Sequence, residues 1–123
     1  MKTIIQKNAD ISKTLLINGR ARGFTVRVAD SLLSRSIGLI GKRGLSKEGL
    51  LITRCASIHT FFMRFAIDAV FLDGSGDVVK VIENIGPWRM IFPVRGAGCV
   101  LELASPAAKT LGIKPGDKLG WNK

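Results

Sequence analysis

The chain has few side chains that can act as nucleophiles, proton carriers or metal ligands, and several of them lie close together. Its only histidine, His59, follows Cys55, one of two cysteines, by four residues. Four residues of extended strand span about 13 Å, which is too far for a Cys–His hydrogen bond. Cys99 could contact His59 if the two residues lay on neighbouring strands. The sequence does not show whether they do. The pattern therefore gives little support to cysteine catalysis.

Metal-ligand patterns are also weak. Structural zinc takes four Cys or His ligands and catalytic zinc takes three, whereas the chain has one His and two Cys in all. Residues 73–77, Asp-Gly-Ser-Gly-Asp, look like the start of a calcium loop, but Val78 and Asn84 stand where the loop needs glycine and glutamate. We predict a hairpin turn there, and neither a metal nor any other cofactor. Ser57 lacks the sequence context of a catalytic serine.

One further set of polar side chains could form a site. It lies between residues 59 and 68, and a hydrophobic loop at residues 86–98 follows later in the chain. One interpretation is a core histidine bonded to backbone, with Arg64 and Asp68 paired on a sheet face. The other is a pocket in which Arg64 binds an anionic group and His59 donates a hydrogen bond or carries a proton. The sequence leaves both open. On the second, the candidate ligand-binding residues are His59, Thr60, Arg64, Asp68, Trp88 and Arg95.

A long strand is predicted to position these residues. Phe, Ile, Val and Thr dominate residues 55–72, and these types suit a pleated, half-buried surface. Strand alternation places His59 on an apolar face, and Thr60, Arg64 and Asp68 on the other. The turn composition of residues 73–77 predicts a hairpin that returns through a strand at residues 78–82.

The central stretch carries a family motif. Residues 55–68, Cys-x-Ser-x-His-Thr-Phe-x-Met-Arg-Phe-x-Ile-Asp, resemble one branch of the family known as domain of unknown function 192. The likeness extends to residues 35–39, 101–103 and 112–117, so it covers roughly Phe24 to Trp121. The family usually has proline where this chain has Ala66, which permits a more regular strand or a looser bend here. The resemblance implies a compact, mainly β domain and brings no reaction with it.

The family's other branch bears on His59. There a tryptophan stands at this position, and tryptophan donates a hydrogen bond but cannot ferry a proton. The resemblance therefore favours His59 as a shape-determining donor, and a binding domain over an enzyme.

The rest of the sequence predicts mostly short strands within a single domain. Asn18-Gly19 predicts a type I′ hairpin turn, with Phe24, Val26 and Val28 facing the core. Strands are also predicted near residues 51–52, 99–103 and 118–121, and helices at about 30–41 and 106–112. We expect one compact antiparallel β-sandwich or barrel of about seven to nine strands with two short α-helices. It would cover residues 1–123, with a loose segment at 1–12.

The composition indicates how the chain folds and where in the cell it resides. The chain is 46% hydrophobic, which suits a packed core. It has no apolar run near the ~20 residues that span a bilayer, and its start is unlike a signal peptide. We therefore expect a cytoplasmic protein, in which both thiols are reduced.

Positive charge is concentrated in the first half. Residues 1–64 hold 12 Lys and Arg against 3 Asp and Glu, which predicts an anionic partner or a solvated basic surface. Residues 41–44, Gly-Lys-Arg-Gly, fit the backbone-clamping loop of KH domains, but only a turn is predicted after them. Since Phe24 is the only aromatic residue before Phe61, any nucleic-acid binding would be weak and independent of base sequence. The candidate anion-binding residues are Lys42, Arg43 and Lys47, joined by Arg20, Arg22 and Arg27.

Three hypotheses follow from these patterns. The leading one is a small binding domain for a small molecule or a protein partner, with its site near residues 59–68 and 86–98. The second is weak, sequence-independent binding to nucleic acid or another anionic surface. The third is a diverged enzyme of unknown reaction. The oligomeric state stays open.

Overall fold

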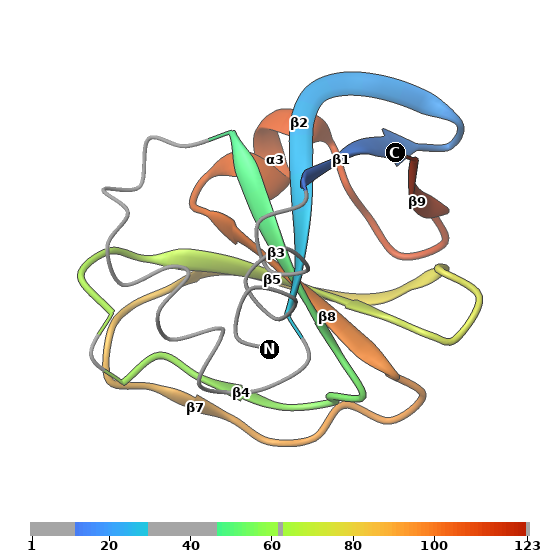
Figure 1. Ribbon diagram of the computed structural model, residues 1–123. Coiled ribbons are helices and arrows are strands. Elements are labelled where there is room, and N and C mark those ends of the chain that lie inside the picture. Colours follow the sequence, from blue (N-terminus) through green and yellow to red (C-terminus); the bar gives the residue numbers. More distant parts are fainter. Residues whose placement is uncertain (1–11, 30–46, 62, 123) are drawn as a thin grey trace, which may run out of the picture.

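The protein is built mainly from β-strands. The computed structural model describes residues 12–29, 47–61 and 63–122 (Figure 1). Within these ranges there are nine strands and one short helix: β1 (Ser12–Ile17), β2 (Arg20–Ala29), β3 (Glu48–Thr53), β4 (Ile58–His59), β5 (Ile67–Leu72), β6 (Val78–Ile85), β7 (Met90–Ile91), β8 (Cys99–Ala104), α3 (Ala107–Leu111) and β9 (Leu119–Asn122). The predicted mainly β fold is confirmed.

Seven of these strands form one curled sheet, a half-barrel, in the order β6-β5-β8-β3-β2-β1-β9 (Figure 1). Strands β4 and β7 form a separate two-stranded sheet. The pairs are antiparallel, as predicted, except that β2 and β3 run parallel, with Val26 opposite Gly49. A parallel pair needs a crossover connection, which the sequence did not reveal. The predicted helix at 30–41, Lys42, Arg43 and residues 1–11 lie outside the described residues.

Both predicted hairpins are confirmed. Asn18 (φ 52°) and Gly19 (φ 84°) form the turn between β1 and β2, because both positions need the left-handed backbone of a type I′ turn. In the second hairpin, the backbone N–H groups of Asp77 and Ser75 donate to Oδ1 of Asp73 at 3.0 and 2.8 Å. These donors hold the pKa of Asp73 below its ordinary value.

The curled sheet has a hydrophobic cluster on each face. One cluster joins Leu101 and Leu103 of β8 to Ala108 and Leu111 of α3. The other joins β5 and β8 to Ile58 of β4 and to residues beside it. Strand β5 lies between β6 and β8 and is buried along its whole length. The fold is therefore a sheet covered by α3 on one face and by the β4 segment on the other.

The prediction of one long strand from residue 55 to residue 72 is wrong. Among the described residues of this stretch, strands occur at Ile58–His59 and Ile67–Leu72 alone. Between the two strands the N–H of Met63 donates to the carbonyl of Thr60 at 3.1 Å, which marks a turn. Met63 is buried and Arg64 is exposed. The Phe-rich composition indicated a strand because buried turn residues are drawn from the same apolar types as strand residues.

Candidate functional site

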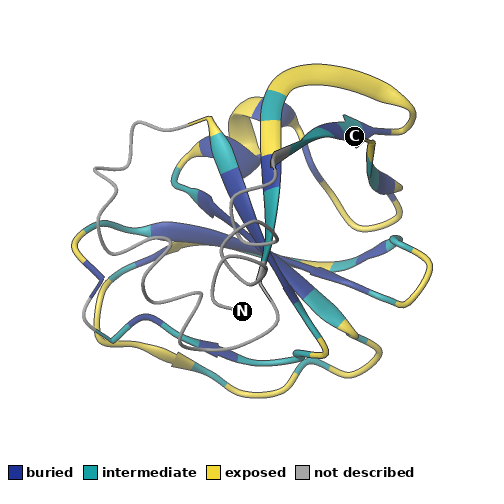
Figure 2. Cartoon of the chain, in the orientation of Figure 1, coloured by how far each residue is buried: buried dark blue, intermediate teal, exposed yellow. Residues whose placement is uncertain are grey.

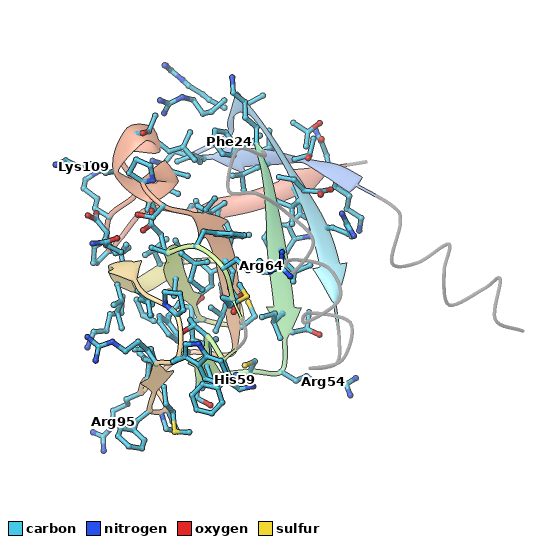
Figure 3. The ribbon with its side chains drawn as sticks, turned by 90° about the vertical axis from the view of Figure 1, so that its left-hand side faces the viewer. Phe24, Arg54, His59, Arg64, Arg95 and Lys109 are labelled. Atoms are coloured by element: carbon cyan, nitrogen blue, oxygen red, sulfur yellow. The ribbon has the colours of Figure 1, made fainter. Side chains whose placement is uncertain are left out.

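A cleft of about 440 Å³ lies between the end of β3 and the two-stranded sheet β4–β7. It is lined by residues 52–59 on one side and 90–93 on the other. Its volume is within the usual range for small-molecule sites. Figure 3 shows Arg54, His59 and Arg95 toward this end of the molecule, with Phe24 and Lys109 toward the opposite end.

The pairing of β4 with β7 builds one wall of the cleft. Ile58 lies opposite Ile91, and His59 lies opposite Met90. Backbone bonds extend the pairing, since the N–H of Thr60 donates to the carbonyl of Arg89 and the N–H of Val94 donates to that of Ala56, both at 2.8 Å. Because residues opposite each other share a face of a sheet, Ile58 and Ile91 lie on the core side, and His59 and Met90 on the other.

The other wall begins where β3 ends. Arg54 is exposed and has a left-handed backbone (φ 53°), a conformation that is uncommon outside glycine and that often marks functional positions. It turns the chain out of β3 and into residues 55–59, which border the cleft. Arg54 is the cation of the cleft lining.

The thiols near the cleft are not arranged as nucleophiles. Sγ of Cys55 donates to the carbonyl of Ser57 at 2.6 Å. Burial is the main cause that raises the pKa of Cys99, and the nearby negative charge of Asp73 raises it further. A raised pKa keeps a thiol protonated, and the thiolate is the reactive form. Both cysteines are free.

An aromatic group continues from His59 along the surface. The rings of His59 and Phe61 lie 4.9 Å apart, and those of Phe61 and Trp88 are stacked at 5.7 Å. The N–H of Phe61 donates to Nδ1 of His59 at 3.3 Å, so the proton of a neutral imidazole would reside on Nε2. The donor role of His59 stays a prediction.

Thr60 and Asp68 lie apart from the cleft lining and bond to backbone. Oγ1 of Thr60 donates to the carbonyl of Gly86 at 2.7 Å and accepts from the N–H of Arg89 at 2.8 Å. The two carboxylate oxygens of Asp68 accept from the N–H groups of Asn84 and Ala108, both at 2.9 Å. In the part of the chain that the structure describes, no ion pair joins Asp68 to Arg64.

The structure therefore brings only part of the predicted set to the cleft. His59 lines it, and Trp88 belongs to the aromatic group beside it. Arg64 and Arg95 are exposed and lie outside the lining. The sequence reasoning missed Arg54, Met90 and Phe92 as cleft residues, although the unusual hydrophobicity of the loop at 86–98 was a signal for the last two.

The basic residues predicted to bind anions are dispersed. Lys47 is exposed, and its carbonyl accepts from the N–H of Thr25 at 2.9 Å. Arg27 forms an ion pair with Glu48 at 2.7 Å. Arg20 and Arg22 lie with Lys114 around a second cavity of about 520 Å³. Among the described residues, no group of three His, Cys, Asp or Glu side chains could hold a metal ion, and no helix is long and apolar enough to cross a membrane.

These features define a small, mainly β protein built on one curled sheet, with a mostly apolar cleft at one end. The chain belongs to the DUF192 family, described as Uncharacterized ACR, whose model matches residues 13–121. The resemblance seen in the sequence is thereby confirmed, and the family description gives no activity or partner.

Relatives and solved structures agree with this assignment. A UPF0127 protein of Pyrococcus furiosus is 35% identical over 109 residues, covering 85% of this chain and 93% of the relative. One from Pyrococcus horikoshii is 39% identical over 102 residues, covering 78% and 86%. A crystal structure from Sinorhizobium meliloti, called a "putative transcription regulator", has a TM-score of 0.76 at 26% identity and covers 90% of this chain and 94% of its own. A protein of unknown function from Novosphingobium aromaticivorans has a TM-score of 0.71 at 25% identity, covering 90% and 84%.

Proposed function

We propose that this protein is a binding domain that holds a small, flat, largely apolar molecule with one anionic group in the cleft beside β4 and β7. The observation that supports it is the composition of the lining, in which the apolar residues Met90 and Phe92 accompany the cation Arg54 and the imidazole of His59. Small-molecule sites typically combine apolar walls with a few convergent polar groups.

Each part of the lining has a role in this proposal. The guanidinium of Arg54 pairs with a carboxylate or sulfonate through two parallel hydrogen bonds. The ring of His59 borders the ligand, and Met90 and Phe92, which line the same cleft, contact its apolar body. Because Arg64 lies outside the lining, the anion-binding role first expected of Arg64 is assigned to Arg54.

The state of the thiols supports binding over turnover and a reducing location. Cys55 is engaged by the carbonyl of Ser57, and burial favours the protonated form of Cys99. Two free cysteines suit the cytoplasm, where thiols are kept reduced. We therefore retain the cytoplasmic location as part of the proposal.

Removal of Arg54 is expected to weaken binding of an anionic aromatic probe. With 1-anilinonaphthalene-8-sulfonate, Arg54→Ala should raise the Kd about tenfold or more, because the variant cannot form the charged hydrogen bond to the sulfonate. Ala56→Phe should abolish binding by filling the cleft, which Ala56 lines. Probe fluorescence, with aromatic carboxylates as competitors, provides the measurement.

Arg64→Ala is the matched control, since it removes an exposed arginine outside the lining and should leave the Kd unchanged. If Arg54→Ala and Ala56→Phe both bind the probe as tightly as the parent, the cleft is not the site.

A second candidate function is sequence-independent attraction to nucleic acid, suggested by the name of the Sinorhizobium meliloti structure. Arg20 and Arg22 are exposed at the start of β2, and Lys47 is exposed near Thr25 of the same strand. Arg27 is neutralised by Glu48 and lies about 17 Å along the strand from Arg22. The basic surface is therefore restricted to Arg20, Arg22 and Lys47.

We expect the triple variant Arg20→Ala, Arg22→Ala, Lys47→Ala to flatten the salt dependence of binding to a labelled DNA duplex. The slope of log K against log salt should fall by about 0.9 for each phosphate that the variant no longer neutralises. The control, Arg64→Ala, Arg89→Ala, Arg95→Ala, removes as many charges elsewhere. If the slope falls equally in both variants, the binding depends on the net charge of the protein and not on this surface.

A further inference from the structure

Exposed hydrophobic surface is concentrated on one short segment. Trp88, Met90 and Phe92 have exposed fractions of 61%, 56% and 76%. In the part of the chain that the structure describes, these are the exposed large hydrophobic side chains. Such residues are normally scattered singly over a surface, and gathering them in one place marks an interaction site. We call these three residues the β7 rim.

The β7 rim exists because the two-stranded sheet is apolar on both faces. Ile58 and Ile91 pack into the core cluster, and alternation directs Met90 and Phe92 to the other side. Trp88 extends this outer face through its stack on Phe61. Figure 2 shows β7 at the outer border of the molecule, and its burial runs from exposed at Met90 to intermediate at Ile91.

The surroundings of the rim are positively charged. The segments 54–67 and 86–98 contain the four arginines Arg54, Arg64, Arg89 and Arg95, and neither segment contains aspartate or glutamate. All four are exposed. Arg54 and Arg95 lie at the same end of the molecule as His59, whereas Arg64 lies nearer its middle (Figure 3); Arg89 lies between Trp88 and Met90 in the chain.

We propose that the β7 rim docks on the surface of an anionic lipid bilayer. Tryptophan favours the interfacial layer of a membrane, where its ring is partly apolar and partly wet. Met90 and Phe92 would enter beside it, and the arginines would pair with phosphate groups of the lipids. The area of the rim argues for a bilayer over a protein partner, because three side chains supply far less than the roughly 800 Å² per partner of a stable interface.

Binding to lipid vesicles tests the proposal directly. In sedimentation at low salt, the protein should bind vesicles of equal parts phosphatidylglycerol and phosphatidylcholine, and not phosphatidylcholine alone. Phe92→Ser should lower the partition coefficient about tenfold, as expected for one buried aromatic side chain. Arg89→Ala and Arg95→Ala should each lower it about fivefold. In a Trp121→Phe background, the emission of Trp88 should shift to the blue on binding.

Lys109→Ala with Lys114→Ala is the charge-matched control, because Lys109 lies toward the opposite end of the molecule (Figure 3) and Lys114 lies beside the second cavity. If this control loses as much binding as Arg89→Ala with Arg95→Ala, or if Phe92→Ser binds like the parent, the rim is not the docking surface. The proposal would also be overturned if the protein failed to bind anionic vesicles, or if the rim mediated self-association of the protein and not vesicle binding.

The cleft and the rim can be tested separately. Met90 and Phe92 belong to both the cleft and the rim, whereas Trp88 belongs to the rim and not to the cleft lining. Trp88→Ser should therefore weaken vesicle binding while still binding the fluorescent probe. Vesicle binding without any probe binding would remove the proposed ligand function alone. Probe binding without vesicle binding would remove the membrane proposal alone.

Discussion

Asp68→Ala is expected to lower the free energy of unfolding by about 3–5 kcal/mol, the largest single-residue effect that we predict. The side chain of Asp68 is fully buried. One oxygen accepts from the N–H of Asn84 on β6 and the other accepts from the N–H of Ala108 on α3. Asp68 thereby joins β5 to β6 and to α3, and alanine would leave two backbone donors without an acceptor in the interior.

Urea unfolding followed by circular dichroism measures this effect. Asp68→Asn should lower the free energy of unfolding by about half as much. Its amide oxygen can still accept one of the two hydrogen bonds, whereas its NH₂ group faces the other backbone N–H and cannot accept from it. Asp77→Ala is the surface control, since its ion pair with Lys118 is half exposed at 3.4 Å and should contribute less than about 1 kcal/mol. A loss for Asp68→Ala no greater than that for Asp77→Ala would contradict the structural role.

Local signals explain why the hairpins could be predicted. Asn18-Gly19 and the Asp73 turn contain the residues that their backbone conformations require, so a few neighbours determine them. The order β5-β8-β3 is different, because β8 pairs with segments about thirty and about fifty residues away in the chain, and such contacts leave no local pattern. The parallel pairing of β2 with β3 was missed for the same reason.

The cleft could be predicted only in part. His59 and the hydrophobic loop were identified because a lone histidine and exposed apolar residues are conspicuous. Arg54 was missed because its position depends on a left-handed backbone at the end of β3. An arginine in the sequence does not indicate that conformation. Thr60 and Asp68 were grouped with the ligand-binding candidates because buried polar side chains that bond to backbone have the same types as those that bind ligands.

Thr60→Val is expected to lower the free energy of unfolding by about 2–3 kcal/mol and to loosen the attachment of the 86–89 loop. Valine matches threonine in volume but cannot replace the hydroxyl. In the protein Thr60 is fully buried, donates to the carbonyl of Gly86 and accepts from the N–H of Arg89. Strands β4 and β7 have only two residues each, so the two-stranded sheet depends on such bonds beyond its ends.

Amide hydrogen exchange distinguishes local loosening from a uniform loss of stability. In Thr60→Val, the amides of Trp88 and Arg89, which donate to the carbonyl and the hydroxyl of Thr60, should lose more protection than the amides of the fully buried strand β5. Thr60→Ser retains the hydroxyl and should keep most of the protection, although it loses a methyl group from the interior. Retained protection in the valine variant, with protection lost in the serine variant, would show that the methyl group, and not the hydroxyl, holds the loop in place. Because Met90 and Phe92 follow this loop directly, loosening it should also weaken probe binding in the cleft and vesicle binding by the β7 rim.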